Sequence, residues 1–455
     1  LGANDAQLDF PVVYASAKNG FAKLELEDED KDMQPLFEMI LKHVEDPEGD
    51  ENEPLQMLIT NTEYDEYVGK LGTGRIYNGK VEKNGDITLI KRDGEMVNAK
   101  VTRIYGYDGL KKVEMEEASA GDIVTVAGIE KIDIGETVAD RNNPKPLPLI
   151  DIDEPTLAMT FVVNDSPFAG QDGKFVTSRN ILERLQKEVN HNVSMRLEMT
   201  DSPDAFIVKG RGELQLSILL ENMRREGYEF QVSKPEVLYK KDKNGKLLEP
   251  IEIVTIDVDQ EFVGSVIEKL GQRKADLVNM NPSQAGYTRL IFNIPARGLI
   301  GYRSEFLTDT RGSGTLNTEF KGYEPFKGEI PKRNVGSLIC FETGVATAYG
   351  LNSAQERGIL FISPQAEVYE GMVVGSNAKG LDIEVNVCKK KQQTNIRSSA
   401  SDDALKLSPP KIMSLEEMLE FIESDEYIEV TPKSLRMRKK ILDSQLRYKS
   451  KKNSK

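Results

Sequence analysis

The sequence predicts a multidomain α+β protein, and three observations lead to this fold class. Its 455 residues suffice for about three or four domains. Residues 55–140 hold short β-rich segments separated by glycine turns, which indicates a small closed β-barrel. Two later blocks, residues 156–240 and 250–326, both read strand, helix, strand, strand, helix, strand. This order predicts two ferredoxin-like βαββαβ domains in tandem.

The N-terminal segment contains the stretch YASAKNGFA at residues 14–22. The preceding FPVVYA predicts a buried strand, and the Asn-Gly dipeptide predicts a turn. In guanine-nucleotide-binding domains a Ser-Ala-Lys on such a turn closes over the base. Here the Ala17 N–H would face guanine O6 and the Lys18 stem would pack on the ring. The alternative is an ordinary surface turn. The phosphate-binding motif GxxxxGK[ST] occurs nowhere in the sequence.

Domain boundaries follow from linkers and changes of composition. QPLFEMILKHV has apolar residues at helical spacing, and the acid- and proline-rich run after it is typical of a linker. The proline-rich NNPKPLPLIDIDEP is a second connector, and KLGTGR at residues 70–75 is interpreted as a barrel turn. The predicted units are residues 1–50 (N-terminal segment and linker), 51–148 (β-barrel), 149–240 and 241–326 (ferredoxin-like), and 327–455 (mixed, β-rich).

The C-terminal unit combines glycine-rich β segments with a polar stretch and a helix. The helix is SLEEMLEFIES, in which Ser414 and Glu417 have the spacing of a capping box. The run CKKKQQTNIRSSASDDALKLSPP, residues 388–410, carries three lysines, Arg397 and several amide and hydroxyl side chains without an apolar pattern. Such a loop can place cations on phosphates while amides reach sugars or bases. A solvated loop between strand and helix is the alternative.

Charge is unevenly distributed along the chain. The net charge of −15 taken alone argues against a nucleic-acid partner. From residue 432 to the end, however, ten Lys or Arg stand against one acid, Asp443, so this tail carries +9. The tail is therefore a candidate polyanion-binding surface. Its cations are Lys433, Arg436, Arg438, Lys439, Lys440, Arg447, Lys449, Lys451, Lys452 and Lys455.

No catalytic or metal site is predicted for this chain. The two histidines, His43 and His191, each fit a helix end or turn, and no close Cys or His spacing suits zinc. The two cysteines, Cys340 and Cys388, indicate a reducing compartment without a disulfide framework. No apolar run approaches the ~18 residues of a membrane span. We expect a cytoplasmic protein without a membrane partner.

The order of these parts resembles the BipA/TypA family of translational GTPases over essentially the whole chain. The most specific stretches are PARGLIGYRSEFLTDTRGSGTLNTEFKGYEPFKGEI, NVCKKKQQTNIRSSASDDALKLSPP and EYIEVTPKSLRMRKK. Elongation factor G and LepA are similar through the barrel and both ferredoxin-like domains, but they lack the last domain. Two alternatives stay open: another ribosomal GTPase of the elongation factor G or LepA type, and an RNA-binding structural module that does not use GTP.

The resemblance carries expectations about nucleotide binding. It implies that residues 1–50 are the C-terminal remnant of a GTP-binding domain, with Ser16, Ala17 and Lys18 as its last guanine-contacting motif. The full-length protein would hydrolyse GTP on the ribosome with GTP or GDP and Mg²⁺ as cofactors. This chain would lack the phosphate loop and switch regions, so we expect it to bind no cofactor and to be inactive alone.

The resemblance also implies where the protein acts. A BipA/TypA-like protein would dock as a monomer at the ribosomal factor site, contact ribosomal RNA and A-site transfer RNA, and have roles in large-subunit assembly and in stress or cold adaptation. The candidate RNA-contacting residues are Lys389, Lys390, Lys391, Asn395, Arg397, Arg436, Arg438, Lys439 and Lys440.

Overall fold

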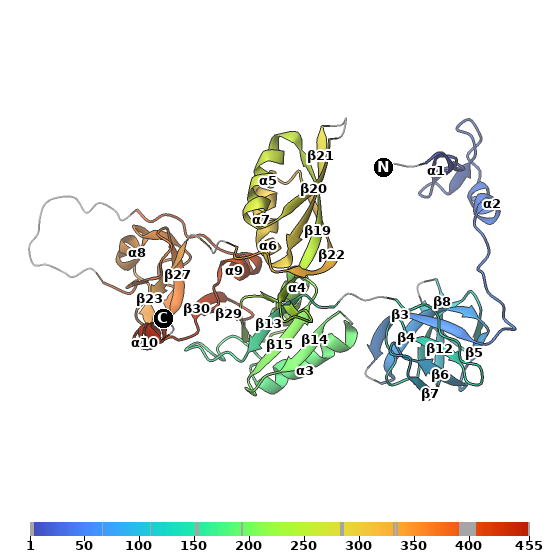
Figure 1. Cartoon of the computed structure of the whole chain (residues 1–455), viewed down its shortest axis with the longest axis horizontal. Coiled ribbons are helices and arrows are strands. Elements are labelled where there is room, and N and C mark those ends of the chain that lie inside the picture. Colours follow the sequence, from blue (N-terminus) through green and yellow to red (C-terminus); the bar gives the residue numbers. More distant parts are fainter. Residues whose placement is uncertain are drawn as a thin grey trace, which may run out of the picture. The chain divides into compact units, whose positions relative to one another are not determined.

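The computed structural model describes residues 4–65, 67–109, 111–150, 154–192, 194–282, 286–330, 333, 335–390 and 406–453. The chain divides into two compact units, Leu1–Asp151 and Ile152–Lys455. Figure 1 shows both units as a β-rich mixture of helices and sheets. This agrees with the predicted α+β class.

The N-terminal segment of the first unit is small and open. It consists of α1 (Asp5–Leu8), the antiparallel hairpin of β1 (Tyr14–Ser16) and β2 (Phe21–Lys23), and α2 (Gln34–His43). The helix predicted from QPLFEMILKHV is present, yet its apolar face is exposed, and Leu41 is 82% exposed. Contrary to the prediction of a buried strand, β1 has no fully buried residue.

Antiparallel strands around one core form the rest of the first unit. The main sheet has eight strands in the order β7-β6-β12-β3-β4-β11-β8-β9, and β5 pairs with β10. Among the described residues no ladder joins β7 to β9, so backbone pairing does not close the barrel. The bounds are β3 (Gln56–Asp65), β4 (Gly69–Asn78), β5 (Lys80–Glu82), β6 (Asp86–Ile90), β7 (Met96–Lys100), β8 (Arg103–Asp108), β9 (Lys111–Met115), β10 (Glu117–Ser119), β11 (Ile123–Ala127) and β12 (Thr137–Asp140).

The KLGTGR motif lies inside β4, so its interpretation as a turn was wrong. Its glycines serve close packing between strands. A Cβ at Gly74 would stand 2.0 Å from the Leu58 carbonyl oxygen of the neighbouring strand β3. Only glycine allows that approach. The core behind these strands includes Met57, Ile76 and Val126.

The second unit begins with a split βαβ arrangement. Strand order is β14-β15-β13-β16 with antiparallel neighbours, the order that a βαββαβ sandwich requires. Helices α3 and α4 bury Ile181, Leu185 and Leu216 in the same core as Phe161. The bounds are β13 (Leu157–Val162), α3 (Ser178–His191), β14 (Arg196–Met199), β15 (Ala205–Gly210), α4 (Glu213–Arg225), β16 (Phe230–Val232), β17 (Glu236–Val237) and β18 (Lys240–Lys241).

The next segment repeats this arrangement with its own core. Its strands are ordered β20-β21-β19-β22, again with antiparallel neighbours. Val254, Leu270 and Phe292 lie between sheet and helices. The bounds are β19 (Leu247–Asp259), the 3₁₀ turn Gln260–Phe262, α5 (Val263–Gln272), β20 (Asp276–Pro282), β21 (Tyr287–Pro295), α6 (Ala296–Leu299), α7 (Tyr302–Asp309) and β22 (Thr315–Pro325).

The C-terminal segment has a glycine-rich β portion, the predicted helix with its capping box, and a final hairpin and helix. Ser414 accepts from the Glu417 N–H, and Glu417 accepts from the Ser414 N–H. The bounds are β23 (Gly336–Cys340), β24 (Gly344–Val345), α8 (Ala348–Gln355), β25 (Gly358–Leu360), β26 (Glu367–Val368), β27 (Met372–Asn377), β28 (Ile383–Val385), α9 (Leu415–Phe421), β29 (Glu426–Val430), β30 (Leu435–Lys439) and α10 (Ser444–Asn453).

The sequence predicts that residues 149–240 and 327–455 form separate domains. In the structure, strands of these two segments belong to one sheet. Strand β16 pairs antiparallel with β29, so an 11-stranded sheet runs from β14 to β28. Ile428, Val430 and Met437 of the C-terminal hairpin share one core with Phe230 and Val232. The hairpin thereby covers what would be the exposed edge of the first ferredoxin-like sheet.

Candidate nucleic-acid interface

The predicted guanine-contacting residues lie on the turn of the β1–β2 hairpin. Ser16 ends β1, and its carbonyl accepts from the N–H groups of Asn19 and Gly20 at 3.1 and 2.9 Å. Gly20 has φ of +75°, which glycine adopts readily. Ala17 and Lys18 are exposed on this turn. The arrangement presents a short polar loop to solvent, as a base contact would need.

The lysines that open the predicted RNA-contacting loop are exposed. Lys389 and Lys390 follow Cys388 directly, and the Thr347 hydroxyl donates to the Lys389 carbonyl at 2.6 Å. This bond fixes the backbone at the base of the loop while both ammonium groups face solvent. The candidates Lys391, Asn395 and Arg397 lie outside the described residues.

The basic residues of β30 are placed differently. The side chains of Arg438 and Lys439 are each 2% exposed. Arg438 pairs with Asp165 at 2.9 Å, and the Lys439 ammonium lies 2.8 Å from Asp382 and 2.9 Å from Glu426. Burial opposes charge on Lys439, but the carboxylates outweigh it and keep its pKa raised. Both cations are buried and paired with carboxylates of the same chain. This pairing argues against their predicted contact with RNA.

Arg436 belongs to a buried polar network centred on Glu429. The Glu429 carboxylate is fully buried and accepts from Asn164 at 3.1 Å, Ser166 at 3.0 Å, Tyr369 at 2.9 Å and Arg436 at 3.1 Å. Asn164 and Ser166 come from the first ferredoxin-like segment, whereas Tyr369 and Arg436 come from the C-terminal one. The network therefore joins the two segments, and Arg436 has a structural role in it.

Sequence reasoning missed the acids that pair with these cations. In the observed hairpin register Glu426 faces Lys439 and Glu429 faces Arg436. Opposite charges directly across an antiparallel pair stabilise a sheet. Folding EYIEVTPKSLRMRKK as a hairpin would have revealed both pairs. Composition alone instead places Arg436 and Lys439 in a basic tail.

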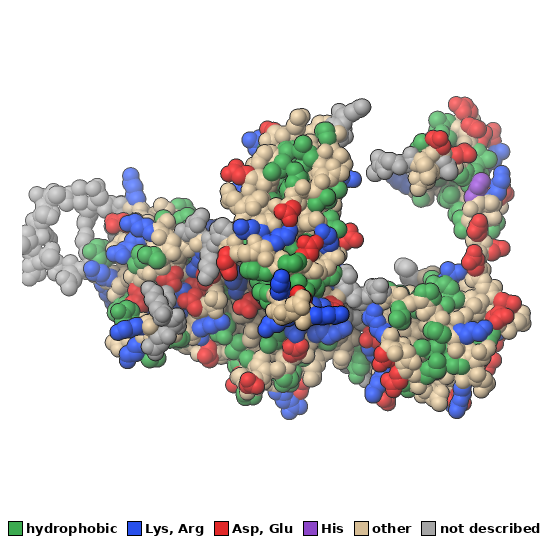
Figure 2. Space-filling view, in the orientation of Figure 1, with side chains coloured by type: hydrophobic (Ala, Val, Ile, Leu, Met, Phe, Trp, Pro, Cys, Tyr) green, Lys and Arg blue, Asp and Glu red, His purple; other side chains and the backbone are tan. Residues whose placement is uncertain are grey.

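Exposed cations remain elsewhere in the C-terminal segment. Lys433, Lys440, Lys449 and Lys452 are exposed, and the Lys440 ammonium lies 4.8 Å from the Tyr427 ring centroid. Arg447 is instead buried and pairs with Glu384 at 2.8 Å. Figure 2 shows blue and red side chains intermingled over the visible face of this unit. Among the described residues, the visible surface of the C-terminal segment therefore has no continuous basic patch. A contact with RNA would depend on individual exposed lysines.

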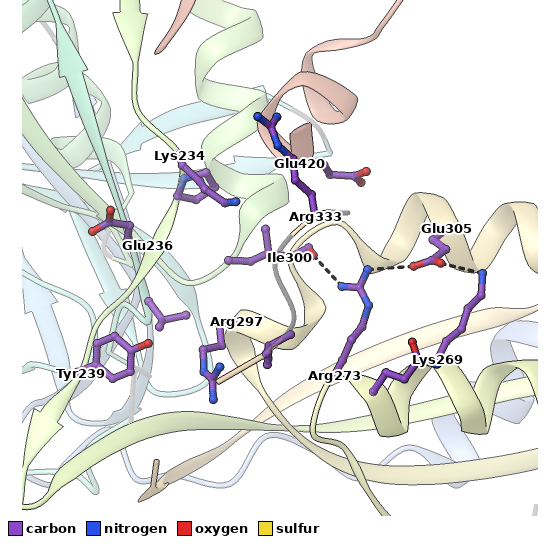
Figure 3. A pocket seen from close by; sticks show the side chains of 14 residues that line it. Lys234, Glu236, Tyr239, Lys269, Arg273, Arg297, Ile300, Glu305, Arg333 and Glu420 are labelled. Carbon is purple, nitrogen blue, oxygen red and sulfur yellow. Dashed lines mark hydrogen bonds and ion pairs between the residues drawn. The ribbon is translucent and has the colours of Figure 1, made fainter. Parts of the chain in front are cut away.

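A cleft of about 540 Å³ lies where the two ferredoxin-like segments meet the C-terminal one. Five cations line it, and the structure gives each an internal partner. Figure 3 shows Arg273 donating to the Ile300 carbonyl at 3.0 Å and to Glu305 at 2.9 Å, while Lys269 approaches Glu305 at 2.7 Å. Lys234, Arg297 and Arg333 pair with Glu423, Glu249 and Glu426. Ion pairs and hydrogen bonds within the chain therefore already engage the cations that line the cleft.

Neither a metal centre nor a membrane span is found in the described part of the chain. No group of three or more His, Cys, Asp or Glu side chains there is arranged to hold a metal ion. No helix among those residues combines the length and apolar character needed to cross a bilayer.

Family models match three parts of the chain. Residues 69–139 match elongation factor Tu domain 2, residues 246–334 match the elongation factor G C-terminus, and residues 335–444 match the TypA/BipA C-terminal domain. Together with the β-rich first unit and the repeated split βαβ arrangement, these matches define a translation factor.

Curated relatives identify the family. The large ribosomal subunit assembly factor BipA of Bacillus subtilis (strain 168) is 52% identical over 456 residues, which is 100% of this chain and 74% of that protein. The proteins of the same name from Synechocystis and Escherichia coli K12 are each 49% identical, covering 96% and 97% of this chain and 73% of theirs. The chain belongs to the BipA/TypA family.

A crystal structure of a Thermus thermophilus protein is also similar, with a TM-score of 0.42 and 16% identity over 65% of this chain and 59% of that one. This likeness is too weak to add to the assignment.

Proposed function

We propose that this chain is the ribosome-binding portion of a translational GTPase that acts in the cytoplasm on assembly of the large ribosomal subunit. The observation that carries this proposal is the 49–52% identity, over almost the whole chain, to proteins named large ribosomal subunit assembly factor BipA. The match of residues 335–444 to a TypA/BipA C-terminal domain favours this family over elongation factor G or LepA. The proposed function includes roles in stress and cold adaptation.

The proposed partner is the ribosome, reached as a monomer at its factor site. Lys389 and Lys390 support a contact with ribosomal RNA or A-site transfer RNA because both are exposed at the start of a polar loop. The polar composition of the loop adds Lys391, Asn395 and Arg397 to the proposed contact, and Lys440 is added because it is exposed. Arg436, Arg438 and Lys439 are left out because carboxylates already bind them.

The direct test is co-sedimentation of the chain with purified ribosomal subunits over a salt series. We expect it to pellet with large subunits at low salt. About five contacts to phosphates would make log affinity fall with log salt with a slope of about −4, because each contact releases counterions. Retention in the supernatant at every salt concentration, or a slope near zero, would refute RNA-mediated docking.

GTP is the proposed cofactor of the full-length protein, with Mg²⁺. Ser16, Ala17 and Lys18 fit a base contact, but no GxxxxGK[ST] motif is present in this sequence to hold phosphates. We therefore expect calorimetric titration of this chain with GTP to show no binding in the micromolar range. The full-length Bacillus subtilis relative is the positive control. Micromolar affinity of this chain would contradict the proposal.

A further inference from the structure

Three helical elements meet beside the cleft of Figure 3: the start of α4, the α6–α7 turn and α9. The Gly301 N–H, between α6 and α7, donates to Glu213 Oε2 of α4 at 3.4 Å. A Cβ at Gly301 would stand 2.8 Å from Glu420 Cγ of α9. The second ferredoxin-like segment therefore touches the rest of its unit through a close contact against two glutamates.

The Glu213 carboxyl group is incompletely bonded in this contact. Its Oε1 atom is buried and has no hydrogen-bond partner among the described atoms. The side chain lines a groove of about 290 Å³ whose apolar walls include Leu299 and Leu316. A buried acceptor without a donor costs free energy, and it costs most when the carboxyl group is ionised.

The charged groups around Glu213 are mainly acidic. Glu416 and Glu420 face it from α9, and Glu252 lines the same groove from β19. Arg273 at the end of α5 is the cation that acts on Glu213, but its guanidinium already binds Glu305 and two backbone carbonyls. The other cations that line the groove are Arg211, which lies near Glu252, and Arg303 on α7.

These surroundings shift the pKa of the Glu213 carboxyl group toward neutral pH. Burial raises the pKa of Glu213 to about 7, with a further increase from Glu420 and Glu416. The Gly301 N–H and Arg273 act in the opposite direction, as does the position of Glu213 at the N-terminal end of α4. Burial also raises the pKa of Glu252 to about 7 and raises that of Glu420.

We propose that the contact of the α6–α7 turn with α4 and α9 is a proton-sensitive joint. It is tight while Glu213 carries a proton, because a neutral carboxyl group tolerates the apolar groove and its acidic neighbours. It loosens when Glu213 ionises, because the charged carboxylate is then held in an apolar groove beside Glu416 and Glu420, and separating the α6–α7 turn from α4 and α9 exposes it to water. This joint would set the orientation of the second ferredoxin-like segment, and it does not depend on the proposed ribosome binding.

The sign of the effect follows from proton linkage. In the open joint Glu213 regains its ordinary pKa near 4.5, whereas in the closed joint the pKa is about 7. The closed state therefore binds more protons between these values, and raising the pH through this window favours opening. Above the window both states are ionised and no further change follows. We expect the ratio of closed to open molecules to fall at least about tenfold between pH 5.5 and 7.5.

Fluorescence energy transfer on the full chain tests the joint. Dyes are attached to cysteines replacing Asp201 and Glu268, which are exposed on the two ferredoxin-like segments, in a Cys388→Ser background where Cys340 stays buried. Wild type should shift from one transfer population to another as the pH rises. Glu213→Gln, which is neutral at every pH, should keep at pH 7.5 the transfer that wild type shows at pH 5.5.

Two further variants separate the joint from general effects of charge. Glu420→Gln removes a like charge beside Glu213 and so lowers the pKa of Glu213 in the closed joint, which narrows the pH window of opening and should leave a larger closed fraction at pH 7.5 than in wild type. This variant also serves if Glu213→Gln fails to fold. Glu319→Gln removes an exposed carboxylate from β22 and should titrate as wild type does. Constant transfer in wild type overturns the proposal, as does an unchanged transition in folded Glu213→Gln or in Glu420→Gln.

Discussion

Replacing Glu429 with alanine is expected to destabilise residues 152–455 by about 3–5 kcal/mol, the range for removing one partner of a buried ion pair. The fully buried carboxylate accepts from Asn164, Ser166, Tyr369 and Arg436. Alanine would leave the Arg436 guanidinium without this carboxylate, and three polar groups would lose an acceptor. Because the network joins β29 and β30 to the first ferredoxin-like segment, the joined sheet should lose its cooperativity.

The measurement is urea unfolding followed by circular dichroism, with the transition of the second unit fitted separately, because a chain of two compact units need not unfold in two states. Glu319→Ala on exposed β22 is the matched control and should change the free energy of unfolding by less than about 0.5 kcal/mol. Equal stability of the two variants would show that the network contributes nothing.

Replacing Lys389, Lys390, Lys391 and Arg397 together with alanine is expected to weaken ribosome binding strongly. Each lost phosphate contact removes about 0.7–0.9 from the salt slope, so four contacts account for roughly 3 units of it. Over a fourfold change in salt this difference corresponds to about 50- to 150-fold in affinity. The fold should be unaffected because the described members of the set, Lys389 and Lys390, are exposed.

Co-sedimentation over the same salt series measures this loss, and thermal unfolding checks the fold. A matched control replaces four exposed lysines elsewhere, Lys42, Lys111, Lys243 and Lys246, which removes the same charge. If both quadruple variants bind alike, the effect is one of net charge. If the loop variant binds as wild type does, with an unchanged slope, the loop does not contact RNA.

Local patterns made the elements of the interior predictable. The spacing of apolar residues predicted two helices, in SRNILERLQKEV and in GELQLSILLENMRR, and both are present as α3 and α4. Their apolar residues Ile181, Leu185 and Leu216 are buried. Ser414 caps α9 as its spacing to Glu417 indicated. These features depend on a few neighbouring residues, which a sequence shows directly.

Long-range pairing could not be read in the same way. Nothing near FQV at β16 indicates that its partner is YIEV of β29, and the buried state of Arg438 and Lys439 depends on that pairing and on Asp165 and Asp382. The exposure of β1 likewise depends on which other residues pack against it. Composition located positive charge correctly along the chain but could not tell which cations the fold itself neutralises.

The pairing of β16 with β29 also has a consequence in time. Phe230 faces Val430, a separation of 200 residues along the chain. At a synthesis rate of about 5–20 residues per second, β16 would wait roughly 10–40 s after leaving the ribosome for its partner strand to be made. During that interval the nascent chain would carry an unpaired strand edge, the feature through which β proteins aggregate. The edge of the first ferredoxin-like sheet is thus exposed to wrong strand pairing while the protein is being synthesised.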